Sequence, residues 1–218
     1  MMKALTIALD CADEKDKKGA QRGRRETRVP EILEAAIRVF ANEGNAGFTQ
    51  RRVAAAAEVR LATLQHYFGS RDSLLLATID ELAKRYLSRF RQVAEDSTQS
   101  AEARLEALLD ETFDVLTGAG NVVSPFALEV WCLAEHHETV RERNEQVSGE
   151  FQTLFGKLVA QMNPNLSNSE CQIRGALIYS HWQGLIVFLR RAGRNTPNLP
   201  AFQRATRVVW KALSTAPA

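Results

Sequence analysis

Apolar side chains recur every three to four positions along almost the whole chain, and few stretches show the two-residue alternation of a strand. In the first such segment, near residues 29–42, Ile32 and Phe40 lie on one helical face. Gly44 and Gly47 predict the end of this helix, because glycine punctuates helical patterns. The pattern therefore predicts an all-α protein.

Two short helices are predicted next. Thr49 is a suitable N-cap for a helix over Gln50 to Ala57, in which Val53 faces inward together with Ala57. After a turn near 58–60, a helix of about two turns ends at Gly69. Both short helices have one apolar and one polar face.

A long helix and a larger helical remainder follow. Ser70 caps the long helix, Asp72 in its first turn suits the helix dipole, and the apolar period lasts to about Glu95. Beyond a polar boundary at 96–101, we predict helices near 101–117, 123–135, 137–162, 168–192 and 199–214. The expected organisation is an arm over 1–24, a small helical unit over 25–71, a connecting helix over 72–95 and a larger helical domain over 96–218.

The predicted helix over 168–192 is apolar on two sides. Ile178 and Trp182 belong to one stripe, whereas Leu177 and Phe188 belong to another. A helix that is apolar on two sides is buried on two sides. The second stripe fits a subunit interface shared with the last helix, or the centre of a larger monomeric core.

Charge is distributed unevenly although the net charge is only +2. Residues 22–71 hold nine Arg against five Glu (+4), and residues 72–218 hold fifteen basic against seventeen acidic groups (−2). Positive charge therefore gathers near the N-terminus, as expected for a surface that meets a polyanion. The basic run RGRRETR at 22–28 is either an arm that contacts DNA or a solvated tail.

Cys11, Cys132 and Cys171 show no metal-ligand spacing and are odd in number, which favours free thiols in a reducing compartment. The apolar run near the start is too short for a secretion signal, and no run approaches the ~20 apolar residues of a membrane helix. We therefore expect a cytoplasmic protein without membrane contact.

The stretch RLATLQHYFGSRDSLL, residues 60–75, fits a helix-turn-helix plan. Leu64 and Phe68 anchor a short helix whose outward side carries hydrogen-bonding groups, and such a helix can enter the major groove of DNA. Gln65 and Thr63 are suited to base edges, whereas Tyr67 and its neighbours can reach phosphates. The alternative is a polar surface helix without a partner.

The run from Ile32 to Leu75, with ILEAAIRVFANEG, FTQRRVAAAAEV and TLQHYFGSRDSLL in order, resembles the N-terminal domain of TetR/AcrR-type transcriptional regulators. The resemblance implies a homodimeric repressor, paired through its two C-terminal helices, which binds a palindromic double-stranded DNA operator and is released by a small-molecule effector. The residues expected at DNA are Thr49, Gln50, Arg51, Arg60, Ala62, Thr63, Gln65, His66, Tyr67 and Arg71.

Departures from the family pattern fall where DNA is read. The family usually has Gly in the turn, where this chain has Glu58, and often Ser, Lys and Gly where this chain has Arg60, Leu61 and Ala62. Gln65 replaces a common Tyr. Arg60 can supply a charge-assisted phosphate contact in place of a hydroxyl cap. Because the departures fall where DNA is read, the family's operator sequences do not carry over to this chain.

Aromatic and polar groups on the inner helices are candidates for an effector pocket, although any one Trp or Phe on such a helix more often belongs to a plain core. The candidates are Phe126, Trp131, His137, Phe151, Phe155, Tyr179, Trp182 and Gln183.

An enzyme is the first rival hypothesis. The sequence has no Gly-rich phosphate loop, no nucleophile with a supporting base and no metal spacing, so we expect no catalytic residues, metal or cofactor. The second rival is a helical DNA-binding or interaction protein that needs no ligand. A cavity in the C-terminal half, or stabilisation by a metabolite, distinguishes a ligand-gated regulator from this ligand-independent protein.

Overall fold

The computed structural model describes residues 27–217, and within this range the chain is helical and contains no strand. Helical residues 27–47 are followed by α2 (Gln50–Ala56) and α3 (Leu61–Phe68). The long helix α4 (Arg71–Ala94) comes next. The arm over 1–24, with Arg22, Arg24 and Arg25, lies outside the described residues.

The remaining helices match the predicted ones to within one or two residues. They are α5 (Ala101–Thr117), α6 (Val123–Ala134), α7 (Glu138–Met162), α8 (Asn168–Arg191), a short 3-10 helix (Gly193–Asn195) and α9 (Leu199–Thr215). The all-α prediction is confirmed. No helix in the described part of the chain is long and apolar enough to cross a membrane.

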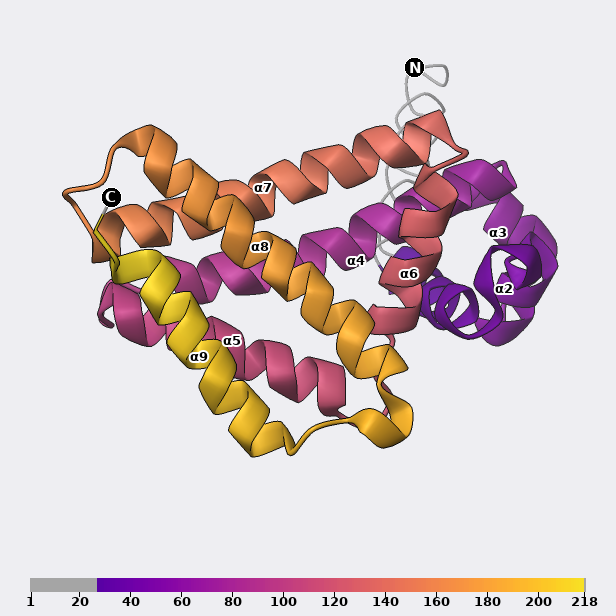
Figure 1. The fold of residues 1–218 in the computed structure, drawn as a ribbon. Coiled ribbons are helices and arrows are strands. Elements are labelled where there is room, and N and C mark those ends of the chain that lie inside the picture. The colour runs from indigo at the N-terminus through magenta and orange to yellow at the C-terminus, as the bar shows by residue number, and fades with distance from the viewer. Residues whose placement is uncertain (1–26, 218) are drawn as a thin grey trace, which may run out of the picture.

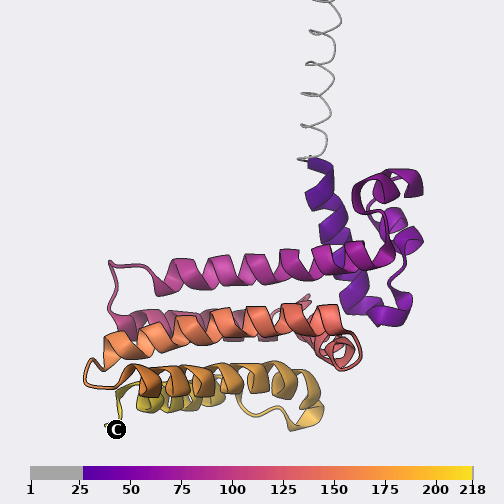
Figure 2. The ribbon, with the colours of Figure 1, turned by 90° about the horizontal axis from the view of Figure 1, so that it is seen from above.

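Layers of long helices make up most of the molecule. Figure 2 shows α4 on one side, α5, α6 and α7 in the middle, and α8 with α9 on the opposite side. Residues 27–47, α2 and α3 gather at one end of this stack, around the start of α4 (Figure 1). The outer side of the α8–α9 layer therefore faces away from α4.

Side-chain caps fix where five helices begin. Side-chain oxygens of Thr49, Ser70, Ser100, Ser167 and Asn198 each accept a hydrogen bond from a backbone N–H in the first turn that follows. Capping satisfies donors that a helix cannot satisfy internally. Local chemistry of this kind explains why boundaries were predictable from the sequence.

Helical residues continue past Gly44 to position 47, further than the predicted end near Asn42. Gly44 does adopt a left-handed φ of 65°, but the chain just after it is held from two sides. The Asn45 N–H donates to a Glu129 carboxylate oxygen at 3.0 Å, and the Asn45 carbonyl accepts from Arg71 at 2.8 Å. These long-range bonds sustain a last turn that the local pattern did not predict.

Two apolar clusters form the core, and they do not divide at the predicted domain limits. The first surrounds Phe40 and Leu64 and also includes Phe126 and Val130 of α6. The second surrounds Phe155 and Trp210 in the long-helix stack. Because α6 packs against residues 27–47, the limits at 71/72 and 95/96 stay predictions.

Helices α7 and α8 approach each other closely at a pair of glycines. A Cβ placed on Gly175 would lie 2.4 Å from the Gly156 nitrogen and 2.9 Å from the Gln152 carbonyl oxygen. By contrast, a Cβ on Gly184 would meet nothing within 4 Å. The close crossing therefore depends on Gly175, and the small residues around Gly184 lie on an open face.

Candidate nucleic-acid interface and ligand cavity

The face of α3 that points outward carries the predicted reading residues. Leu64 is fully buried and fixes the inner side, whereas Ala62, Gln65 and His66 are exposed and Thr63 is half-buried. The rings of His66 and Tyr67 lie 5.4 Å apart, edge to face. The short helix thus presents amide, hydroxyl and imidazole groups to solvent from a rigid apolar base.

A chain of amides connects α3 to α2. The Gln65 amide nitrogen donates to the Gln50 side-chain oxygen at 3.4 Å, and the Gln50 amide nitrogen donates to the Gly69 carbonyl at 3.0 Å. Gln50 therefore orients Gln65. The free lone pairs and remaining N–H of Gln65 can form the paired hydrogen bonds by which an amide reads adenine.

Arg71 is tied into the fold by its guanidinium. Its Nε donates to the Phe48 carbonyl at 2.9 Å and one terminal nitrogen donates to the Asn45 carbonyl at 2.8 Å. The guanidinium also lies over the Phe48 ring, 5.8 Å from the centroid. Arg71 therefore positions the start of α4, and contact with a phosphate would use the nitrogen that now faces Asp72.

Exposed cations flank the two short helices. Arg51 and Arg60 extend into solvent, and neither has an ion-pair partner among residues 27–217. Arg52 is paired with Glu43. Thr49 accepts the Arg52 N–H at 3.2 Å, so its hydroxyl hydrogen stays available to a phosphate oxygen.

Glu58 occupies a backbone conformation that favours glycine, with φ at 53°. Left-handed backbone costs a non-glycine residue roughly 1–2 kcal/mol. The turn between α2 and α3 requires this conformation, since the Val59 N–H donates back to the Ala54 carbonyl at 3.0 Å. The glycine that the family pattern has at this position is thereby explained.

An apolar cavity of about 100 Å³ lies between α4, α6, α7 and α8. Five of the eight predicted ligand residues line it, namely Phe126, Trp131, Phe151, Tyr179 and Trp182. The rings of Phe151, Tyr179 and Trp182 are stacked, with centroids 5.0 to 5.8 Å apart. The cavity therefore has a flat aromatic wall.

Polar groups behind this wall are mostly satisfied. The Tyr179 hydroxyl donates to Ser148 at 3.0 Å and accepts from the Gln183 amide at 3.2 Å, while the Trp182 N–H donates to Thr112 at 3.1 Å. Burial raises the pKa of Tyr179 above its ordinary value, so the phenol remains neutral. Gln183 thus orients Tyr179 and does not itself line the cavity.

Two other predicted ligand residues lie elsewhere. Phe155 is fully buried in the packed core, with its ring 5.6 Å from that of Trp210. His137 precedes α7 as its N-cap residue in the turn after α6. Residue type alone did not distinguish a core aromatic from a cavity aromatic, because both are apolar and periodic.

The sequence interpretation also missed lining residues, among them Ile79, Ala83, Tyr86 and Asn144. The period along 71–95 places Ile79 and Tyr86 on one stripe, but that stripe predicted burial and not a hollow.

Helix α6 connects the cavity to the helix-turn-helix. Phe126 lines the cavity, and its ring lies 4.9 Å from that of Phe40 in the N-terminal cluster. Three residues further on, Glu129 accepts the Asn45 N–H, and Asn45 in turn binds Arg71 at the start of α4. Direct contacts therefore run from the cavity through α6 to the helix-turn-helix.

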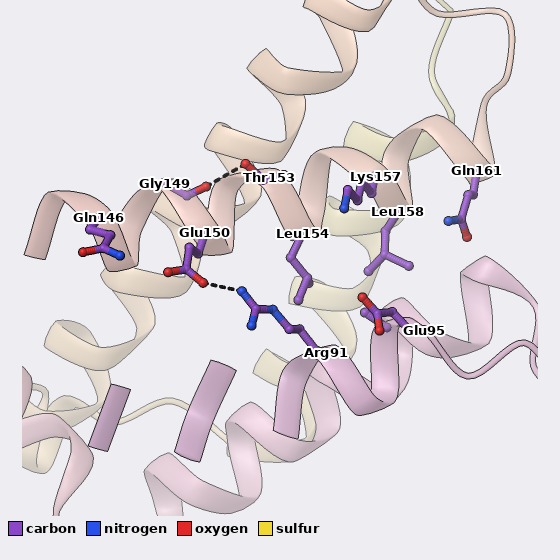
Figure 3. Close-up of a pocket in the computed structure, with 11 residues that line it drawn as sticks. Arg91, Glu95, Gln146, Gly149, Glu150, Thr153, Leu154, Lys157, Leu158 and Gln161 are labelled. Atoms are coloured by element: carbon purple, nitrogen blue, oxygen red, sulfur yellow. Dashed lines mark hydrogen bonds and ion pairs between the residues drawn. The ribbon is translucent and has the colours of Figure 1, made fainter. Parts of the chain in front are cut away.

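A longer hollow of about 380 Å³ lies on the outer side of α4 and α7. Figure 3 shows Arg91 reaching from α4 to Glu150 on α7 across this hollow. Its other lining groups include Glu95, Lys157 and Gln161. Within residues 27–217, no cluster of three or more acidic, His or Cys side chains is suited to hold a metal ion.

Comparison with known proteins places the N-terminal region in a family. Residues 32–85 match the model of bacterial regulatory proteins of the tetR family. An HTH-type transcriptional regulator encoded in the dhlA 5' region of Xanthobacter autotrophicus is 35% identical over 124 residues, which are 54% of this chain and 58% of that relative. The chain thus aligns with little more than half of that relative's length.

A second relative is the HTH-type transcriptional regulator BetI of Paraburkholderia phymatum, 27% identical over 71% of this chain and 76% of its own length. Solved structures share the fold across most of the molecule. A TetR transcription regulator from Haloarcula marismortui has a TM-score of 0.70 at 19% identity, covering 87% of this chain and 97% of its own. FadR from Bacillus subtilis, in complex with stearoyl-CoA, has a TM-score of 0.68 at 15% identity, covering 87% and 100%.

Proposed function

Since this chain is a TetR-type transcriptional regulator, we propose that it acts as a ligand-responsive repressor, a homodimer that leaves a palindromic operator when a small molecule fills its cavity. The observation that carries the proposal is α3, whose apolar side is buried at Leu64 while its hydrogen-bonding side is exposed.

Base contacts are assigned to Gln65 and Thr63. The methyl group of Ala62 is assigned to an apolar contact with a thymine methyl group. Phosphate contacts come from exposed Arg51 and Arg60 and from the Thr49 hydroxyl. His66, Tyr67, Gln50 and Arg71 complete the surface, Gln50 and Arg71 chiefly by holding it in shape.

Dimerisation is assigned to the outer face of α8 and α9. Large apolar side chains are exposed there, with Val208 at 68%, Ile173 at 54% and Leu177 at 48% of their surface accessible. Exposed apolar surface of this kind marks an interaction site, and the open Gly184 between its residues allows close approach. A second copy of the same face is the partner that gives two α3 helices the two-fold symmetry of a palindrome.

Dimerisation is tested by placing a charge on this face. Leu177→Arg combined with Val208→Arg leaves the monomer core intact because both side chains are exposed. Light scattering should give twice 24.3 kDa for the wild type and 24.3 kDa for the double variant. A wild-type mass of one chain at micromolar concentration contradicts the assignment.

The effector role is assigned to the apolar cavity beside α6. A neighbour of the same fold, FadR, binds stearoyl-CoA, which supports a sensor function for the long-helix half. A ligand acts by its differential affinity for two states, here two placements of α6 and α4 relative to the helix-turn-helix. Two α3 helices must sit about 34–36 Å apart to enter successive major grooves.

Footprinting of the protein on the DNA upstream of its own gene tests operator binding. The wild type should protect a palindrome, and Gln65→Ala combined with Thr63→Ala should lose it while keeping the helical circular-dichroism spectrum. Glu81→Ala is a matched control on the same half of the molecule, away from α3. Protection that survives in the double variant would refute the role of α3.

The second candidate function is a DNA-binding protein without an effector. The small size of the cavity favours it, since about 100 Å³ is below the range of most drug-sized sites. It predicts that no small molecule raises the melting temperature or releases the DNA.

A further inference from the structure

Between α4 and α7, the apolar cavity is separated from a surface hollow by residues that line both, and we call this place the window. Ala83 and Val147 line the cavity on its inner side, and the same two residues floor a surface hollow of about 190 Å³ on the outer side. Both are partly exposed, so they form a thin wall made of small groups. Ala83 and Ala127 have the shortest side chains of the cavity lining.

Two ion pairs frame this window. Arg143 of α7 reaches Asp80 of α4 at 3.4 Å on one side, and Arg91 of α4 binds Glu150 of α7 on the other. All four side chains are roughly one-third to one-half exposed. Exposed pairs are weak, because solvent competes for both partners, so the frame opens at little cost.

Charge at the window is unbalanced. Lys84, Arg91 and Arg143 stand against Asp80 and Glu150, three cations against two anions. Lys84 is the unpaired one, since it forms no ion pair or side-chain hydrogen bond within residues 27–217. The cavity behind the window has no charged lining residue, and its polar groups belong to Asn144, tyrosines and tryptophans.

We propose that the effector is a small organic anion, with a compact apolar body in the aromatic cavity and its acidic group at the window against Lys84. A charge could not enter the cavity itself, because no group there compensates its desolvation. The volume limits the body: a cavity of about 150 Å³ lined by apolar side chains holds a benzene ring, and about 100 Å³ is smaller, so the body is at most one ring or a short alkyl chain. A long acyl chain does not fit.

The window geometry also assigns a second contact. Arg143 can exchange its exposed partner Asp80 for the ligand's carboxylate, and the side chain of Asn144 beside it forms no hydrogen bond within the described residues. This inference rests on the proposed sensor role of the cavity, but it concerns binding to the protein alone.

The test uses tryptophan fluorescence of the full chain without DNA. Trp131 and Trp182 line the cavity, whereas Trp210 lies in the core against Phe155. Benzoate, phenylacetate and hexanoate are the anionic probes, benzyl alcohol is the neutral probe and benzylamine the cationic probe. We expect saturable quenching by at least one anion below millimolar concentration, with benzyl alcohol weaker and benzylamine weakest.

Variants identify the head-group site. Lys84→Met keeps the apolar stem and should weaken carboxylate binding about tenfold while leaving benzyl alcohol unchanged. Lys157→Met is the matched control, because Lys157 lines the hollow of about 380 Å³ but neither the window nor the cavity; it should change the binding of neither probe. Ala83→Leu should block the binding of every probe, because the larger side chain fills the cavity beside the window. Circular dichroism checks that this variant is folded.

Three results would overturn the inference: no anion binds, benzylamine binds as tightly as benzoate, or Lys84→Met and Lys157→Met behave alike. The operator footprint is measured separately and without these probes. Loss of the footprint with intact benzoate binding would refute only the repressor proposal. An intact footprint without anion binding would refute only the proposal of an anionic effector.

Discussion

The glycine crossing between α7 and α8 makes a quantitative prediction about stability. In Gly175→Ala the new Cβ would lie 2.4 Å from the Gly156 nitrogen, where ordinary contact begins at 3.4 Å, so the two backbones must separate by about 1.0 Å (3.4 − 2.4). The obstructing atoms belong to the backbone and cannot rotate away. Overpacking of this kind costs up to about 3 kcal/mol.

Alanine also gains about 1 kcal/mol of helix propensity over glycine. The net destabilisation is then about 2 kcal/mol, which for a chain of this size lowers the melting temperature by about 4–8 °C. Thermal unfolding followed by circular dichroism at 222 nm measures it, at one protein concentration because a dimer's stability depends on concentration.

Gly149→Ala is the matched control, because it lies inside α7 and its Cβ would meet nothing within 4 Å. It should raise the melting temperature by a few degrees through propensity alone. Gly156→Ala should fall between the two, since its Cβ would meet only the Gln172 side chain, which can swing aside. A melting temperature of Gly175→Ala at or above that of the wild type would refute the reasoning.

Two further predictions concern single residues. Glu58→Gly relieves the left-handed φ of 53°, a gain of roughly 1–2 kcal/mol, and loses about 0.4–1 kcal/mol to the freer unfolded chain. It should therefore stabilise the protein by up to about 1 kcal/mol in chemical denaturation, and a lower stability would contradict the reasoning. Burial lowers the pKa of His181 below 6.5, and its Nδ1 accepts the Trp210 N–H at 3.1 Å. The unfolded state therefore binds more protons near pH 6, so the free energy of unfolding falls as the pH drops below 6.5. His181→Gln should flatten that part of the profile of stability against pH. An unchanged profile contradicts the prediction.

Features that depend on neighbouring residues were determined by the sequence itself. Helical periods, Ser and Thr caps, and glycine and proline breaks fixed the helices from α2 onward to within one or two residues, because these signals act over a single turn. The exposed polar side of α3 follows from the same local logic, as Leu64 is buried and Gln65 is exposed. The second apolar stripe of α8 also emerged as surface, at Leu177.

Only the tertiary structure decided what depends on segments far apart in the chain. Arg71 was expected at a phosphate, yet carbonyl groups more than twenty residues away hold it. Phe155 and Phe151 look alike in sequence, but the packing of α8 and α9 puts the first in the core and the second on the cavity wall. The window at Ala83 and Val147 exists because two helices of different segments bring small side chains together there. Such a thin wall has no local signature, since it is set by the volumes that meet across the core.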